Sequence, residues 1–256
     1  MRFENKVAII TGGGSGIGAE AARQFVAQGG KVVINGRTQS KLDAVANEID
    51  PSGASVATFA GNIGIAATGQ GLVDTATERF GGVDVLFNNA GIFTPKPFVD
   101  ATEEEYDNFV DTILKGKFFA AQAAAKAMKK RGGGAIVQTG SMWGLQAMGV
   151  TPSAAYSAAN GGVHQLTKNL ALELANDNIR VNSVALGAVV TPVYSTFMSD
   201  AEIEAALPTF HAIHPLGRMG MPSDVVNALL FFASEDAGWI TGTILPVDGG
   251  IMAGRN

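Results

Sequence analysis

The sequence predicts an α/β protein built on a parallel, doubly wound sheet. Short runs rich in β-branched residues alternate with longer stretches of helical character along the 256 residues. Most of the short runs are apolar throughout, which is typical of strands that helices cover on both faces. A glycine-rich segment, 11–18, joins the first run to the first helical stretch and predicts a tight turn at the end of the first strand.

The individual elements follow from the same patterns. We expect strands at 7–11, 32–35, 56–60, 83–88, 135–139, 179–186 and 243–247. We expect helices near 17–28, 40–49, 66–80, 103–130, 153–176 and 223–233. Because no linker rich in Pro or Ser interrupts this alternation, residues 1–256 are expected to form a single domain.

The composition excludes several functional classes. The chain has no cysteine, which excludes disulfides, thiolate metal sites and a cysteine nucleophile, and no histidine cluster suggests a metal site. Its 18 basic and 23 acidic residues give a net charge of −5, whereas nucleic-acid-binding proteins more often show a basic excess. No apolar stretch approaches 18 residues, so we expect a cytoplasmic protein that does not bind a membrane.

The glycine-rich segment has the properties of a phosphate-binding turn. It reads Thr-Gly-Gly-Gly-Ser-Gly-Ile-Gly over 11–18, with Gly12, Gly16 and Gly18 between a predicted strand and a predicted helix. A phosphate at a helix N-terminus needs exposed backbone N–H groups without side chains in the way. The segment therefore predicts a dinucleotide site.

The end of the second predicted strand indicates which dinucleotide binds. An acidic residue there would bond the ribose 2′-hydroxyl of NAD, whereas an arginine would accept the 2′-phosphate of NADP. The sequence reads Asn35-Gly36-Arg37-Thr38, without a carboxylate. Arg37 favours NADP(H) over NAD(H), the alternative being that Arg37 only caps a surface turn.

Several motifs, in order along nearly the whole chain, resemble those of the short-chain dehydrogenase/reductase family. They are TGGGSGIG at 11–18, NNAG at 88–91, Ser141 ahead of Tyr156, PLGR at 215–218, ITG at 240–242 and VDGG at 247–250. The branch it resembles is that of 3-oxoacyl-carrier-protein reductases and secondary-alcohol dehydrogenases. The resemblance implies a Rossmann-type sheet of seven strands in three α/β/α layers. It also implies hydride transfer between a nicotinamide and a carbonyl or alcohol carbon.

The resemblance also implies a set of cofactor-binding residues. Asn88, Ala90 and Gly91 would line the ribose side, and Asn62 would contact the adenine where the family usually has Asp. The full set is Gly12, Ser15, Gly16, Ile17, Gly18, Arg37, Asn62, Ile63, Asn89, Ala90, Gly91, Tyr156, Gly187, Val189 and Thr191.

By the same resemblance, Tyr156 is the proton donor and Ser141 orients the carbonyl. Ser141 follows the predicted strand 135–139, so its hydroxyl would emerge at the carboxyl end of the sheet, where ligands bind in this architecture. The loop between Ser141 and Tyr156 is longer than the family commonly shows.

Two further catalytic positions depart from the family. Its Tyr-x-x-x-Lys signature here ends in Asn160, and the asparagine that usually holds a relay water is Ile113. A unit charge about 4 Å from the phenol at an effective dielectric near 20 would lower its pKa by at most about three units, and Asn160 cannot supply that field. Lys115 and Lys117 lie nearby and are expected to be solvated surface charges.

The remaining candidates concern the substrate. We expect His164 to be a packing residue, and His211 and His214 to lie in a lid at about 190–215, where they contact substrate or solvent. The expected pocket walls suggest a substrate with a hydrophobic part. They are Met142, Trp143, Met148, Val193, Tyr194 and Phe197.

The sequence therefore predicts an NADP(H)-dependent oxidoreductase acting on a carbonyl or secondary alcohol of a small or partly hydrophobic substrate. The alternative is a catalytically impaired or inactive dinucleotide-binding homologue, which Ile113 and Asn160 favour and the retained Ser141 and Tyr156 oppose. A homotetramer is expected from the resemblance and from the alanine-rich helical stretches 103–130 and 153–176, whose small side chains permit close packing.

Overall fold

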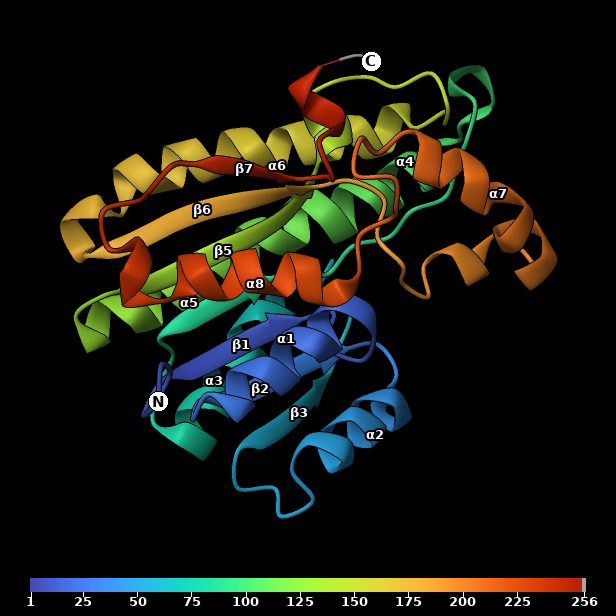
Figure 1. Cartoon of the computed structure of the whole chain (residues 1–256). Helices are drawn as coiled ribbons and strands as arrows, with labels where there is room; N and C mark the ends of the chain where they lie inside the picture. Colours follow the sequence, from blue (N-terminus) through green and yellow to red (C-terminus); the bar gives the residue numbers. More distant parts are fainter. Residues whose placement is uncertain (255–256) are drawn as a thin grey trace.

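The computed structural model describes residues 1–254, and within them seven parallel strands form one sheet in the order β3-β2-β1-β4-β5-β6-β7 (Figure 1). The strands are β1 (Val7–Thr11), β2 (Lys31–Gly36), β3 (Val56–Ala60), β4 (Val85–Asn88), β5 (Gly134–Ser141), β6 (Ile179–Leu186) and β7 (Ile244–Val247). The predicted Rossmann-type α/β fold is thus confirmed. The strand order reverses between β1 and β4, and such a switch point is where open α/β sheets bind ligands.

Helices cover both faces of the sheet. On one face lie α1 (Gly16–Ala27), α2 (Gln39–Ile49) and α8 (Pro222–Ala233), which share a core cluster with β1 and β2. On the other lie α3 (Ala66–Phe80), α5 (Gly116–Arg131) and α6 (Ala154–Glu173). Short 3-10 turns occur at Phe98–Asp100, Met142–Gly144, Ala175–Asp177, Tyr194–Thr196, Glu235–Ala237 and Ile251–Ala253.

The single helix predicted at 103–130 is divided into three parts. It consists of α4 (Glu103–Phe109), a π-helical segment (Val110–Lys115) and α5. The π-helical turn inserts an extra residue without ending the helix, so the apolar pattern alone could not reveal it. The π-helical segment contains Ile113, and the extra residue changes the direction of the side chains on this part of the helix.

A further helix, α7 (Asp200–Ala212), lies in the region predicted as a lid. It begins with a capping box in which Ser199 and Glu202 satisfy each other's backbone N–H groups. None of its residues is buried, so it lacks the strong apolar stripe by which the sequence marks a helix. In Figure 1, α7 projects beyond the carboxyl ends of the strands.

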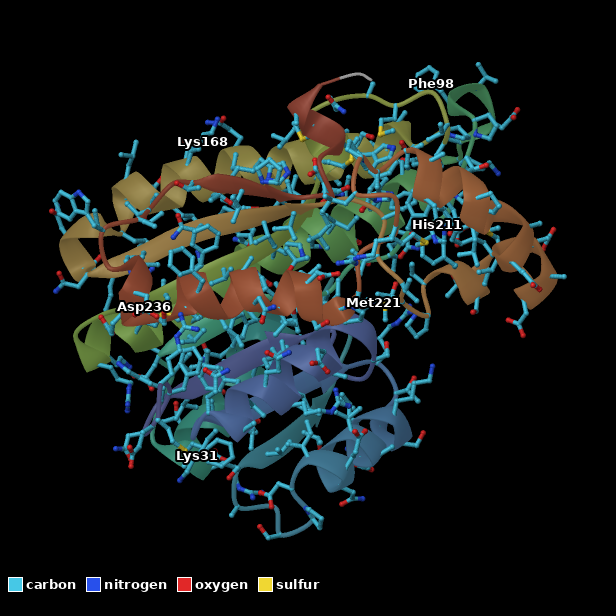
Figure 2. All side chains as sticks on the ribbon, viewed as in Figure 1. Lys31, Phe98, Lys168, His211, Met221 and Asp236 are labelled. Carbon is cyan, nitrogen blue, oxygen red and sulfur yellow. The ribbon has the colours of Figure 1, made fainter. Side chains whose placement is uncertain are left out.

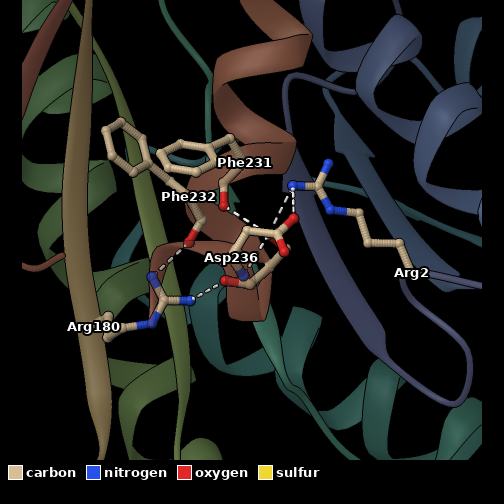
Figure 3. A network of polar contacts seen from close by, with 6 residues as sticks. Arg2, Arg180, Phe231, Phe232 and Asp236 are labelled. Atoms are coloured by element: carbon tan, nitrogen blue, oxygen red, sulfur yellow. Dashed lines mark hydrogen bonds and ion pairs between the residues drawn. The ribbon is translucent and has the colours of Figure 1, made fainter. Parts of the chain in front are cut away.

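Two arginines hold the carboxyl end of α8 (Figure 3). Arg180 of β6 donates to the carbonyls of Phe232 at 2.7 Å and Ser234 at 2.9 Å, which satisfies groups that a helix end leaves free. Arg2 donates to the Asp236 carboxylate at 2.6 Å and to the Ser234 hydroxyl at 2.9 Å. These contacts tie the N-terminus and β6 to the same turn, far from the carboxyl ends of the strands.

Candidate active site

The glycine-rich turn between β1 and α1 forms an open cradle. Gly12 and Gly16 have φ values of +71° and +53°, which side-chain-bearing residues rarely adopt. A Cβ at Gly18 would lie 2.2 Å from the Gly12 carbonyl oxygen, so only glycine fits there. Ser15, at the N-cap of α1, makes no side-chain capping bond, which leaves the first N–H groups of the helix available. The turn therefore fits the pyrophosphate of a dinucleotide.

A cleft of about 200 Å³ opens beside this turn, at the carboxyl ends of β1, β2 and β4. Seven predicted cofactor residues line it: Gly12, Ser15, Arg37, Asn62, Ile63, Ala90 and Gly91. Residues that the sequence reasoning did not select also line it: Gly14, Asn35, Gly36, Thr38, Lys41, Leu42, Gly61, Ile92 and Thr112. Most of these adjoin a selected residue in the chain, but Lys41 and Thr112 reach the cleft from within α2 and the π-helical segment.

The charged side chains among the described cleft residues are Arg37 and Lys41, both cationic. Arg37 is exposed. The position where a carboxylate would select NAD is Gly36, which also lines the cleft. The residue before it, Asn35, is buried and donates its amide to the carbonyls of Phe59 at 3.0 Å and Gly61 at 3.1 Å. It therefore stabilises the β2–β3 edge of the cleft.

The NNAG segment, residues 88–91, forms the floor of the cleft and is hydrogen-bonded to Thr11 of β1. The Thr11 hydroxyl accepts the backbone N–H groups of Asn89 and Ala90, each at 2.9 Å. The Asn89 amide donates back to the Thr11 carbonyl at 3.1 Å. Gly12 packs so closely that a Cβ there would lie 3.0 Å from the Ala90 Cα. The phosphate turn and the floor therefore form one rigid unit.

The remaining predicted cofactor residues lie beyond the cleft itself. Thr191 adjoins the phosphate turn, since a Cβ at Gly16 would lie 3.3 Å from its Cγ2. Val189 forms a parallel bridge with Gly220. Gly187 follows β6 and packs against Asp248 and His214. Ile17 and Gly18 are buried in the first turn of α1.

Ser141 and Tyr156 lie where the prediction placed them. Ser141 is the last residue of β5, is 2% exposed, and accepts the Trp143 N–H at 3.3 Å. Tyr156 lies in the first turn of α6, and its ring and that of Phe93 form a T-shaped contact at a centroid distance of 4.9 Å. Burial raises the pKa of the Tyr156 phenol above its usual value, and the neighbouring Ser141 and Asn160 side chains partly oppose this rise.

The surroundings of Tyr156 contain Asn160 and an apolar cluster. Asn160 is 3% exposed and donates its amide to the Tyr156 backbone carbonyl at 2.9 Å. Ile113, 2% exposed, belongs to a cluster with Phe109, Ala159 and Val163, against which Tyr156 packs. Burial has the largest influence on the pKa of the Tyr156 phenol, and Asn160 contributes a hydrogen bond and no charge.

The prediction that Lys117 is a solvated surface charge is wrong. Lys117 is 1% exposed, and its amine donates to the backbone carbonyls of Asn88 at 2.8 Å and Ala90 at 2.9 Å. Lys115 does remain at the surface, paired with Asp111 at 3.0 Å. The π-helical segment ends between these two lysines and α5 then faces the sheet, a change of face that the sequence pattern does not show.

His164 is buried, as predicted, but it is also hydrogen-bonded. One ring nitrogen, Nε2, donates to the Ser141 carbonyl at 2.9 Å, and Nδ1 accepts from the Ser183 hydroxyl at 3.2 Å. Burial, with a smaller contribution from Lys117, lowers its pKa, so the ring is neutral at pH 7. A Cβ at Gly140 would lie 2.3 Å from the ring, so His164 fixes the backbone just before Ser141.

Two of the expected substrate walls, Tyr194 and Phe197, are linked to Tyr156 by aromatic contacts through Phe93. Phe93, which the sequence reasoning missed, contacts both Tyr156 and Phe197, and Tyr194 contacts Phe197 in turn. Burial raises the pKa of Tyr194 to about 12. Trp143, Met148, Val193, Tyr194 and Phe197 are all partly exposed, whereas Met142 is completely buried and supports the turn after Ser141.

The two histidines of the lid region differ. His211, labelled in Figure 2, is exposed on α7. His214 is 2% exposed and accepts the Ala188 N–H at 3.2 Å, so it fixes the segment after β6. In residues 1–254, no cluster of metal-binding side chains is present, and no helix is long and apolar enough to cross a bilayer.

Comparison with known proteins identifies the family to which the chain is related. The family described as "Enoyl-(Acyl carrier protein) reductase" matches residues 12–252. The chain is 39% identical over 251 residues to the 3alpha-hydroxysteroid dehydrogenase of Mediterraneibacter gnavus, covering 97% of this chain and 98% of that one. It is 34% identical over 252 residues to 3-oxoacyl-acyl-carrier-protein reductase FabG of Thermotoga maritima, covering 98% and 100%.

The solved structures show the same relationship. A short-chain type dehydrogenase/reductase from Mycobacterium marinum matches with a TM-score of 0.92 and 32% identity, over 98% of this chain and 97% of that one. The chain therefore belongs to the short-chain dehydrogenase/reductase family. It is an oxidoreductase of the kind that acts on alcohols and ketones, in a family that uses nicotinamide dinucleotides.

Proposed function

We propose that this protein transfers hydride between NADP(H) and a carbonyl or secondary alcohol of a small or partly hydrophobic substrate. The observation that carries the proposal is the side-chain contact between Ser141, at the carboxyl end of β5, and Tyr156, in a fold that also has a glycine-rich dinucleotide cleft. A dinucleotide-binding protein without catalysis has no need of this pair.

In the reduction direction, a bound nicotinamide supplies the hydride that the carbonyl carbon receives. The Ser141 hydroxyl donates a hydrogen bond to the carbonyl oxygen and orients it. Tyr156 gives its phenolic proton to the same oxygen as negative charge develops there, which yields the alcohol and leaves a phenolate. The phenolate then regains a proton from solvent.

The raised pKa of Tyr156 gives carbonyl reduction and alcohol oxidation different pH dependences. Below this pKa the phenol is protonated, which is the form that reduction requires. Alcohol oxidation requires the phenolate, whose population grows only as the pH rises toward the pKa. We therefore infer that reduction proceeds at neutral pH and that oxidation keeps accelerating into the alkaline range.

Preference for NADP(H) is supported by the charge of the cleft. Arg37 and Lys41 are its charged lining residues, and the described lining contains no carboxylate to repel a 2′-phosphate. The Arg37 guanidinium presents a planar set of donors suited to a phosphate. At the other end, the half-buried aromatic side chains of Phe93, Tyr194 and Phe197 support a substrate with a hydrophobic part.

The test is turnover by single-residue variants. Tyr156→Phe and Ser141→Ala are expected to reduce NADPH oxidation with a panel of ketones by about a hundredfold or more, while NADPH binding changes little. Equal turnover by wild type and Tyr156→Phe would contradict the catalytic assignment. NADPH binding by the wild type without turnover on any ketone would select the second candidate, an impaired dinucleotide-binding homologue, which Asn160 and the apolar Ile113 cluster favour.

A homotetramer is the assembly we propose. Support comes from α6, on which Leu172 is 80% exposed, and from Trp239, which is completely exposed before β7. Large apolar side chains so open to water are common where another subunit covers them.

A further inference from the structure

A lysine amine is buried directly beneath the floor of the dinucleotide cleft. Lys117 donates to the carbonyls of Asn88 and Ala90, at 2.8 and 2.9 Å. The Asn88 amide returns a bond to the Lys117 carbonyl at 2.8 Å, so α5 and the end of β4 hold each other reciprocally. The side chain is 1% exposed.

This amine has no carboxylate partner in the part of the chain that the structure describes. Desolvation alone lowers its pKa to about 7. Of the titratable groups on the elements packed around it, His164 of α6 is neutral, Lys168 of α6 is exposed and Asp111 pairs with Lys115. The acids of α3, Asp74 and Glu78, face solvent. A buried ammonium without a counter-charge is costly, and such groups gather at functional sites.

The side chains around the amine are polar where the rest of this layer is apolar. Asn88 of β4 and Gln138 of β5 are register partners, so they point to the same face of the sheet, and Gln138 also pairs with Ser183 of β6. The side-chain amide oxygen of Asn88, Oδ1, and both polar atoms of the Gln138 side-chain amide are buried without a hydrogen-bond partner. An ammonium has three N–H donors, and the two bonds to Asn88 and Ala90 leave one of them unused.

The amine is separated from the cleft by the backbone of a single residue. Ala90 lines the cleft; its carbonyl accepts from Lys117 and its N–H donates to Thr11. Gly12 of the phosphate turn packs on the other side of Ala90. A positive charge at this depth acts through protein rather than water and is poorly screened.

We propose that Lys117 is a positioning residue for the dinucleotide, whose ammonium holds the Asn88–Ala90 backbone under the cleft and supplies a buried positive charge that strengthens binding of this anionic cofactor. The inference rests on the proposed function. The chain has no cation at position 160 but carries one on a different helix, against the floor of the same site.

Thermodynamic linkage between proton binding and dinucleotide binding determines how the affinity changes with pH. If the charged amine favours the anionic dinucleotide, the bound dinucleotide favours the charged amine, so binding takes up a proton. In the free protein Lys117 loses its charge as the pH rises through about 7. Affinity is therefore expected to fall as the pH rises from 7 to 9.

The experiment is calorimetric titration of the full-length protein with NADPH. Wild type and Lys117→Met are compared between pH 7.5 and 9, above the second pKa of a phosphate monoester near 6, so the 2′-phosphate does not titrate. The matched control is Lys115→Met, which removes an exposed lysine two residues earlier. We expect Lys117→Met to weaken binding about tenfold at pH 7.5. Its dissociation constant should not vary with pH, whereas those of wild type and Lys115→Met rise.

A second measurement needs no variant and covers the case in which Lys117→Met fails to fold. Binding enthalpies of the wild type, measured in buffers of different ionisation enthalpy, give the number of protons taken up. Net uptake at pH 7.5–8.5 is expected, and zero uptake would overturn the inference. So would a folded Lys117→Met variant with wild-type affinity and pH dependence. Failure of the wild type to bind NADPH or NADH at all would instead refute the proposed function.

Discussion

The Asn160 side chain bonds the backbone carbonyl of Tyr156, one helical turn earlier, at 2.9 Å. One N–H of its amide is thus used within its own helix, while the side chain still lies close enough to the phenol to oppose the rise of its pKa. A Cβ at Gly144 would lie 2.9 Å from the Asn160 Cβ, so the turn after Ser141 closes over this position. The turn after Ser141 and this part of α6 are therefore closely packed.

Asn160→Lys is expected to lower the pKa of Tyr156, by at most about three units for a cation about 4 Å away. Because burial now holds that pKa above its usual value, the pH at which alcohol oxidation accelerates should move down. The oxidation rate at pH 8 should rise about tenfold. Steady-state rates between pH 6 and 11 would measure both changes.

The matched control is Asn160→Met, which adds length without charge and should leave the pH profile alkaline. If the wild type turns over rapidly at pH 7 and Asn160→Lys leaves its profile unchanged, another group activates Tyr156.

Ile113→Asn is expected to destabilise the protein while assisting Asn160→Lys. Ile113 packs with Phe109, Ala159 and Val163, so a buried amide there should cost about 1–3 kcal/mol of unfolding free energy. In the double variant the amide can hold a water between itself and the new lysine. The decrease in activation free energy in the double variant should then exceed the sum of the decreases in the two single variants, and a double-mutant cycle would measure this difference. Strict additivity would argue against a shared relay.

Arg37→Ala is expected to weaken NADPH binding about tenfold and to leave NADH binding nearly unchanged, because only NADPH carries the 2′-phosphate. Fluorescence titrations with both cofactors would measure the difference. Arg79→Ala, another exposed arginine away from the cleft lining, serves as the control. An equal loss for both cofactors, or a wild-type preference for NADH, would contradict the NADP(H) assignment.

Gly18→Ala is expected to damage the phosphate turn, since the new Cβ would lie 2.2 Å from the Gly12 carbonyl oxygen and the backbone would have to move. We expect a loss of about 1–3 kcal/mol in stability and much weaker binding of either cofactor. Gly14→Ala is the matched control for stability, because its Cβ would meet the Leu42 side chain at an ordinary 3.5 Å. Thermal unfolding of the two variants would measure the difference in stability. Equal unfolding midpoints would show that the close approach of Gly18 to the Gly12 carbonyl does not matter for stability.

Leu172→Glu is expected to dissociate the proposed tetramer without unfolding the subunit, since this side chain is 80% exposed and has little packing to lose within its own chain. Light scattering should report four times the 26.3 kDa of one chain for the wild type, and less for the variant. A monomeric wild type at micromolar concentration would refute the tetramer.

Most of the fold could be predicted because its signals are local. Apolar runs marked every strand, and β1, β3 and β6 begin and end at the predicted residues. The π-helical segment and α7 could not be predicted, because the first keeps a helical pattern and the second buries no residue.

At the site, the sequence by itself determined the glycine turn and the positions of Ser141 and Tyr156, together with an uncharged side chain at position 160. These depend on residue type at fixed places along strands and helices, and strand ends meet wherever a parallel sheet forms. The tertiary structure alone decided that Lys117 is buried, that Phe93 contacts Tyr156 and that the Asn160 amide turns to its own helix. Burial and side-chain direction depend on what packs across from a residue, and that partner lies far away in the chain.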